Sequence, residues 1–258
     1  MIEFSHKNYT LHYTVFGTGN PVVLLHGFLE DHSMWTSISR FLSEKNCAIY
    51  LIDLPCHGKS RFTGENCSMK DIAILLSAFF ESVKIKNPFV FGHSMGGYIG
   101  LELLRLTPIQ LTLVHSNFWA DSSTKKEDRN RVIEIVRRNK TRLIQDAIPH
   151  LFAPNNRAAC EPIIQSLIIH ATAIPANEII ACTRGMRDRE DLTSLIKDHP
   201  IHLIHGEEDP IIPTEVLLQA IEKNRNKAIL HSIPQCGHMS IWENPQALIN
   251  LIQSIVFR

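Results

Sequence analysis

Apolar positions along the chain follow two alternating patterns. Short apolar runs typical of buried strands are followed repeatedly by stretches whose apolar residues recur on one helical face. An alternation of this kind is typical of a parallel sheet covered by helices on both faces. The predicted strands are 2–4, paired with 9–16, then 21–25, 48–52, 88–91, 111–114, 201–205 and 228–233. The predicted helices of this layered part are 33–42, 69–83, 98–106 and 245–255.

The strand pattern stops between about residue 118 and residue 189. Helical periodicity replaces it, with breaks at proline and asparagine. We therefore expect a single domain whose core comprises 1–117 and 190–258, interrupted by an all-helical cap at about 118–189. The helices predicted for this cap are 123–139, 141–150, 157–171 and 175–186.

Composition narrows the functional class. The 258 residues include 26 acidic and 26 basic side chains, so net charge gives no reason to expect nucleic acid or an anionic membrane as partner. We find neither a signal-peptide apolar region nor an apolar run of about 20 residues. The six cysteines are scattered without a C-x-x-C pair, which indicates reduced thiols in a cytoplasmic protein and no zinc site.

One five-residue stretch carries the strongest chemical signal. Residues 92–96 read Gly-His-Ser-Met-Gly, the G-x-S-x-G pattern, between a predicted strand and a predicted helix. A serine at such a turn has its hydroxyl pushed beyond the sheet edge. The glycines on either side are needed because a Cβ there would collide with the neighbouring strand or helix. Ser94 is therefore the candidate nucleophile.

An acid and a histidine follow in the order that a serine nucleophile needs. Asp209 comes directly after a predicted strand, and His238 lies in the loop after the last one. A serine hydroxyl is a poor nucleophile until an imidazole removes its proton, and a carboxylate must orient that imidazole and stabilise its charged form. The chain order Ser94, Asp209, His238 is that of a known hydrolase arrangement.

The acid has competitors. Glu207 and Glu208 are adjacent to Asp209, and Asp121 follows an earlier strand. We favour Asp209 because Pro210 restricts its backbone to an extended turn at the strand exit.

Backbone donors for a negatively charged oxygen are expected at two places. The strand 21–25 ends in His26, Gly27 and Phe28, and Met95 follows the nucleophile. The N–H groups of Phe28 and Met95 would bracket the developing oxyanion. For His26 we favour a structural role, with its ring hydrogen-bonded to the backbone.

With these motifs the chain resembles the α/β-hydrolase superfamily, in the serine-nucleophile, carboxylesterase-like branch. The resemblance rests on His26-Gly27-Phe28, on the segments 53–60 and 92–97, on 205–209 and on Gly237-His238. It implies a mostly parallel eight-stranded sheet with helices on both faces and a lid after the sixth strand. Cys56 stands where the family often has glycine or arginine, in a structural loop. Serine at the elbow argues against the dehalogenase and epoxide hydrolase branches, which have aspartate there.

These inferences predict a serine hydrolase that cleaves a small carboxylic ester or related acyl compound without metal or cofactor. Its partner would be a small-molecule substrate, and the oligomeric state is open. Phe118, Trp119 and Met239 are candidate pocket residues. Phe118 and Trp119 could equally be packing residues at the entry to the cap.

Two alternatives remain open. The first is a C–C hydrolase or lyase of the menaquinone-synthase type, which uses the same triad as a base and would need Arg129, Arg184 or Arg187 to face the pocket. The second is a small-molecule receptor with a slow hydrolase-like site. The stretch 125–142 holds eight basic and three acidic residues, and we interpret it as the solvated side of an amphipathic helix.

Overall fold

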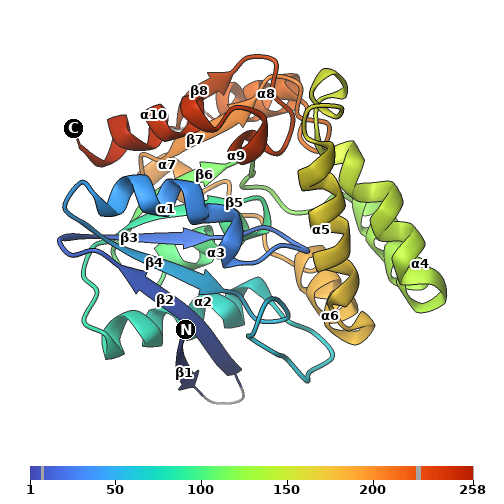
Figure 1. The fold of residues 1–258 in the computed structure, drawn as a ribbon, viewed down its shortest axis with the longest axis horizontal. Coiled ribbons are helices and arrows are strands. Elements are labelled where there is room, and N and C mark those ends of the chain that lie inside the picture. Colours follow the sequence, from blue (N-terminus) through green and yellow to red (C-terminus); the bar gives the residue numbers. More distant parts are fainter. Residues whose placement is uncertain (7–8, 225–227, 258) are drawn as a thin grey trace.

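The computed structural model describes residues 1–6, 9–224 and 228–257, which build one sheet with helices around it (Figure 1). The strand order in the sheet is β1-β2-β4-β3-β5-β6-β7-β8. The strands are β1 (Ile2–His6), β2 (Tyr9–Phe16), β3 (Asn20–Leu25), β4 (Cys47–Asp53), β5 (Phe89–His93), β6 (Gln110–Val114), β7 (His202–Gly206) and β8 (Ile229–Ile233).

Strand direction confirms the predicted sheet. β1 pairs antiparallel with β2, as expected for 2–4 and 9–16, and β2 pairs antiparallel with β4. All later neighbours are parallel. The carboxyl ends of β5, β6 and β7 therefore lie side by side at one edge, where the loops that follow them can meet.

Helices cover both faces, as predicted. One apolar core packs α1 and α10 against the sheet, and a second packs α2, α3 and α8 against the opposite face. The helices of these layers are η1 (His32–Trp35), α1 (Thr36–Ser43), α2 (Met69–Ser82), α3 (Met95–Leu104), α7 (Leu195–Asp198), α8 (Thr214–Asn224), α9 (Ser240–Glu243) and α10 (Pro245–Val256).

The main differences from the sequence prediction concern α3, α4 and α8; the short helices α7 and α9 were not predicted either. α3 begins at Met95, directly after the elbow serine, and not at Tyr98. The glycines at the start of α3 have low helix propensity, so the sequence pattern does not predict a helix there. Tertiary packing stabilises the helix nonetheless. The predicted break near residue 140 is a kink within α4, where Asn139 has φ −154° and ψ 75°. α8 was not predicted.

The segment 123–187 is helical and lies beyond the carboxyl ends of the parallel strands (Figure 1). Its long helices pack around an apolar cluster of their own, which also includes Met239 and contacts Phe28. Of the helices described, none is by itself long and apolar enough to cross a membrane; α5 and α6 pass that test only as a pair bent by 100°. The helices are α4 (Ser123–Ala147), η2 (Ile148–Leu151), η3 (Pro154–Asn156), α5 (Glu161–Ala173) and α6 (Ala176–Arg187).

Candidate active site

Ser94 occupies a strained turn between β5 and α3. Its φ is 49° and its ψ is −112°, a backbone conformation that residues with a side chain rarely adopt. Two contacts hold it: Ser94 N donates to the carbonyl of Val114 at 2.9 Å, and Ser116 Oγ donates to the carbonyl of Ser94 at 2.7 Å. The neighbouring strand β6 and its exit loop therefore fix the elbow from one side.

The two glycines of the motif are explained by close backbone approach. A Cβ at Gly92 would lie 2.5 Å from the carbonyl oxygen of Gly96. A Cβ at Gly96 would lie 2.6 Å from the carbonyl oxygen of Leu25, at the end of β3. Backbone atoms of a buried strand cannot move aside cheaply, so both positions exclude every larger residue.

Asp209 and His238 meet as the sequence predicted. Nδ1 of His238 donates to Oδ2 of Asp209 at 2.8 Å, and both side chains are buried. Oδ1 of Asp209 accepts from the N–H groups of Ile211 and Ile212 at 2.8 and 3.0 Å. Burial by itself would raise the pKa of Asp209, but the attraction of His238 and the hydrogen bonds hold this pKa well below its ordinary value. Asp209 is thus an ionised carboxylate that orients the ring of His238.

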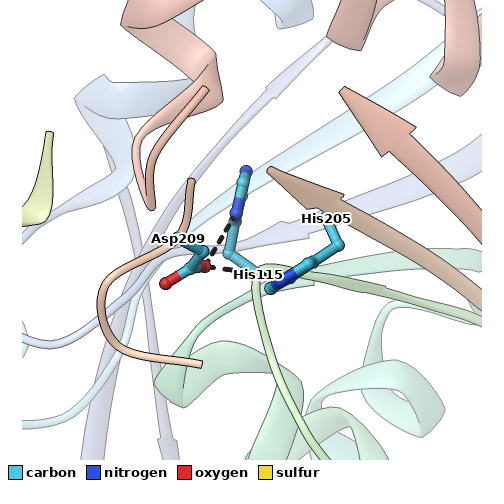
Figure 2. A group of neighbouring side chains, drawn as sticks. All are labelled: His115, His205 and Asp209. Carbon is cyan, nitrogen blue, oxygen red and sulfur yellow. Dashed lines mark hydrogen bonds and ion pairs between the residues drawn. The ribbon is translucent and has the colours of Figure 1, made fainter. Parts of the chain in front are cut away.

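A second histidine shares the same carboxylate oxygen. His115 directly follows β6, and its Nδ1 lies 3.1 Å from Oδ2 of Asp209 (Figure 2). That nitrogen is also 3.4 Å from the N–H of Gly206, and Nε2 contacts Oγ of Ser240 at 2.7 Å. Burial lowers the pKa of His115 to about 3, although Asp209 opposes the shift. The ring is therefore neutral, and either tautomer finds partners.

Sequence reasoning missed His115, although a signal for it was present. It stands at the carboxyl end of a strand, where side chains of parallel sheets converge. It was missed because its partner Asp209 is 94 positions away, and only the adjacency of β6 and β7 brings the two together.

Behind the expected oxyanion loop, an acid and a histidine tie the site together. Glu30 Oε2 accepts from the N–H of Gly27 at 2.8 Å and from Nδ1 of His93 at 3.2 Å. The prediction that His26 is structural is confirmed, since its Nδ1 contacts the carbonyl of Gly27 and its Nε2 accepts from the N–H of Leu54 at 2.9 Å. Gly27 is thereby held in place just before Phe28.

The two expected oxyanion donors have free N–H groups. Met95 is the first residue of α3, so its N–H has no partner within the helix. Phe28 lies in the loop after β3, and no described residue accepts a hydrogen bond from its N–H. Met95 directly follows Ser94, and Phe28 lines the same cavity as Ser94. The Met95 side chain points into the core, where its Sδ lies 3.2 Å from Sγ of Cys182.

A cavity of about 540 Å³ opens above Ser94, between the sheet edge and the helical segment. Ser94 and His238 line it, together with Phe28, Trp119 and Met239. Within the described part of the chain, Ser94 Oγ makes no direct hydrogen bond to His238 in this structure. Apolar side chains from the helical segment form part of the remaining wall, among them Val132, Leu143, Ala147, Ile148, Leu151 and Leu167.

One candidate pocket residue lies elsewhere. Phe118 does not line the cavity: it is buried in the main apolar core, with its ring packed edge-on against Trp119. The chain turns at this point from the sheet to the helices, and neighbouring residues face opposite sides. Trp119 faces the cavity, so Phe118 faces the core.

The arginines divide between the cavity and the outer surface. Arg129 and Arg189 line the cavity and bind the two oxygens of Asp121, at 3.0 and 2.6 Å. Asp121 contacts arginine and not His238, which leaves Asp209 as the acid beside that histidine. Arg184 and Arg187 point away from the cavity, toward Glu65 and Asp188 respectively, and line an outer hollow along α4.

The basic stretch 125–142 has the predicted amphipathic form. Ile133 and Val136 are buried, whereas Arg131, Arg137 and Arg142 are exposed. Each of these three arginines forms an ion pair with an acid three or four positions away on the same helix. Such pairing is typical of a solvated helix face.

The histidine loop has its own support, which the sequence did not reveal. The carboxylate of Glu243 accepts from the N–H groups of Gly237 and Met239, both at 3.0 Å. It also accepts from the N–H of Ala153 at 2.9 Å and from Nδ2 of Asn156 at 2.8 Å. Glu243 therefore connects the loop that carries His238 to Ala153 and Asn156 in the helical segment.

Among the described residues, two groups of histidines and acids have the spacing of metal ligands. One comprises His115, His205 and Asp209, all buried, and the other comprises Asp31, His32 and Asp53. The oxygens of Asp53 already accept from His32 and from the N–H of Lys59.

Comparison with known proteins agrees with this geometry. The chain is 27% identical over 229 residues to the dihydrolipoyllysine-residue acetyltransferase component of the acetoin cleaving system of Pseudomonas putida, a match that spans 86% of this chain but only 59% of that relative. It is 24% identical to the pimeloyl-[acyl-carrier protein] methyl ester esterase of Nitrosospira multiformis, over 93% of this chain and 95% of the relative.

A solved structure is also similar throughout. The thermophilic esterase of Thermogutta terrifontis, described with malate bound, superimposes with a TM-score of 0.88 at 26% identity, over 96% of this chain and 93% of that one. The family model described as "Alpha/beta hydrolase family" matches residues 22–251, from β3 to the last helix. The sheet order, the elbow and this match agree, and the chain belongs to the alpha/beta hydrolase family.

Proposed function

We propose that the protein is a serine hydrolase that cleaves a small carboxylic ester, or a related acyl compound, through an acyl-enzyme on Ser94. The observation that carries the proposal is the 2.8 Å contact between His238 and Asp209, with His238 lining the same cavity as the elbow serine. The esterases among its relatives support an ester as the substrate class.

Each group has a defined part in the first half of the reaction. His238 removes the proton from Ser94 Oγ as this oxygen attacks the carbonyl carbon, and Asp209 stabilises the resulting imidazolium. The N–H groups of Phe28 and Met95 stabilise the oxyanion that forms. His238 then gives its proton to the departing alcohol, and the acyl group stays on Ser94.

Water completes the cycle by the reverse steps. His238 removes a proton from the water, which attacks the acyl carbonyl, and a second oxyanion forms between the same N–H groups. Its collapse releases the carboxylic acid and returns the proton to Ser94.

The cavity favours a substrate with an apolar portion. Its volume of about 540 Å³ is in the range of small-molecule sites. We propose that residues 118–189 act as a cap on a core made of 1–117 and 190–258, since α4 and α5 supply apolar side chains to the wall above Ser94. A cap in this place would exclude water from the acyl group and select its length.

The test is hydrolysis of p-nitrophenyl esters of increasing acyl length by the wild-type protein and by Ser94→Ala. We expect turnover by the wild type and a loss to near the uncatalysed rate in the variant. Ser43→Ala is the matched control, because Ser43 contacts only the carbonyl of Arg40 on the surface. Equal rates for the wild type and Ser94→Ala on every ester would contradict the proposal.

One observation favours a second candidate, a C–C hydrolase or lyase acting on a carboxylate. Lys125, Arg129 and Arg189 line one end of the cavity, where Asp121 neutralises only part of their charge. An anionic group of the substrate would be attracted there. Mass spectrometry of the quenched reaction separates the two candidates, because an ester hydrolase leaves an acyl adduct on Ser94 and a lyase using the triad as a base leaves none.

A further inference from the structure

The ring of His205 packs against that of His115, but its two nitrogens are poorly satisfied. It is buried on β7 with 1% of its side chain exposed, and neither ring nitrogen has a hydrogen-bond partner among the described residues. Buried polar atoms are nearly always paired, so this imidazole, which also interacts with the backbone of Ile212, has capacity for a further partner such as an ordered water or a metal ion. Nδ1 of His205 lies 3.8 Å from Oδ2 of Asp209, which is too long for a hydrogen bond.

The spacing around this ring fits a metal ion. Oδ2 of Asp209 lies 3.1 Å from Nδ1 of His115 and 3.8 Å from Nδ1 of His205, and all three ligand atoms lie within 4.8 Å of one another (Figure 2). Ligands bound to zinc at about 2.0–2.1 Å in a tetrahedron are separated by about 3.3–3.4 Å. The two distances from Oδ2 of Asp209 lie on either side of that value, so zinc binding would require the side chains to shift.

We propose that His115, His205 and Asp209 form a Zn²⁺ site that inhibits the enzyme. Two imidazole nitrogens and one carboxylate oxygen suit Zn²⁺ and its transition-metal neighbours, whereas Mg²⁺ and Ca²⁺ prefer oxygen ligands.

The surroundings of His115 suit zinc binding through Nδ1. In the tautomer protonated at Nε2, the ring donates to Oγ of Ser240 at 2.7 Å and leaves the Nδ1 lone pair free for the metal. A hydrogen bond from the far nitrogen to a fixed acceptor is the usual support of a zinc-bound histidine. Zinc binding then releases no proton to the solvent. Asp209 is already ionised, and in His115 the proton moves from one ring nitrogen to the other.

The inhibitory effect rests on the proposed function, whereas binding itself does not. Asp209 would use for the metal the same oxygen that orients His238. The positive charge of the ion would oppose protonation of His238 during the attack by Ser94. A like charge about 4 Å away, at the intermediate dielectric of a protein interior, reduces turnover on the order of 10³-fold.

The binding test uses the full chain, freed of metal by chelation and titrated with ZnCl₂ in a calorimeter. We expect His205→Leu to bind one Zn²⁺ fewer than the wild type, because leucine fills the site without a ligand atom. His199→Gln is the matched control, since His199 is exposed and distant from the active-site edge of the sheet, and it should keep wild-type stoichiometry. Equal Zn²⁺ binding by the wild type and His205→Leu, or no binding by the wild type, would overturn the proposal.

Two further measurements complete the test. If His205→Leu does not fold, the visible spectrum of the wild type with Co²⁺ decides, because a tetrahedral site absorbs strongly and an octahedral one weakly. Ester turnover with and without Zn²⁺ then tests inhibition: the wild type should lose activity and recover it with EDTA, while His205→Leu should resist Zn²⁺. If His205→Leu binds one Zn²⁺ fewer than the wild type but the wild type cleaves no ester, the metal site is retained and the hydrolase proposal is rejected.

Discussion

Nε2 of His93 donates a hydrogen bond to the backbone carbonyl of His238, 3.0 Å away, although 145 positions separate the two in sequence. Its other nitrogen faces the carboxylate of Glu30. Both partners are acceptors only, so the ring must carry a proton on each nitrogen. Burial lowers the pKa of His93, but Glu30 outweighs it and the pKa is raised overall. A buried imidazolium thus joins the turn that carries Ser94 to the loop that carries His238.

Replacing His93 should destabilise the fold strongly. His93→Gln leaves the buried Glu30 carboxylate without its cation, and breaking a buried pair in this way costs about 3–5 kcal/mol. The free energy of unfolding in urea, measured at neutral pH, checks this. The double variant His93→Gln/Glu30→Gln should recover part of the loss, and equal instability of the single and double variants would contradict the ion pair.

The same pair predicts a pH dependence of stability. The pKa of folded His93 is above its ordinary value of 6.5, so its contribution is complete below that value and is lost as pH rises through the folded pKa. The pKa of Glu30 is lowered despite burial, owing mainly to His93, so its contribution is present above 4.5 and is lost as pH falls through the folded pKa. Urea unfolding across pH should show the difference between wild type and His93→Gln shrinking on the alkaline side. A constant difference would argue against a charged His93.

Asp209→Asn should abolish most turnover while leaving a folded protein. An amide in this position favours the wrong tautomer of His238 and cannot stabilise the imidazolium, which reduces kcat by roughly 10⁴-fold in a serine triad. Ester hydrolysis under saturating substrate measures the loss. Glu208→Gln, at the exposed neighbouring acid, should retain wild-type kcat. Comparable losses in the two variants would assign the effect to the loop and not to the triad.

Gly96→Ala should damage the site far more than Gly100→Ala in the same helix. The added methyl at Gly96 meets the backbone oxygens of Leu25 at the end of β3 and of His26 directly after it, and this would displace the loop that follows β3. At Gly100 the methyl meets only the end of the Leu111 side chain, and alanine gains about 1 kcal/mol in helix propensity. Melting temperature and kcat of both variants test this. Tolerance of alanine at Gly96 would contradict the close approach.

Glu243→Gln should lower kcat more than a surface change of the same kind. The amide keeps one acceptor oxygen where the carboxylate had two, so some of the N–H groups around Gly237, Met239 and Ala153 lose their partner. Loosening of this loop misplaces His238, and a displacement of about 1 Å can reduce the rate by about 10²-fold. Glu222→Gln, on the exposed side of α8, is the control for ester kinetics.

The sequence by itself determined what depends on local chain geometry and chain order. The strand, elbow and helix around Ser94 could be predicted because only glycine permits the close approach at Gly92 and Gly96. The layered fold followed from apolar periodicity, which records which faces are buried. Asp209 and His238 were identified because each follows a strand in a parallel sheet, whose carboxyl ends meet at one edge.

Tertiary structure alone decided which side chains meet inside that edge. His115 reaches Asp209 and His205 because β6 and β7 are neighbours, a fact of strand order that no local pattern encodes. Whether Phe118 or Trp119 faces the cavity depends on one peptide orientation at the turn from sheet to helix. Packing selects among such alternatives through the sum of many distant contacts, and local sequence carries little of that information.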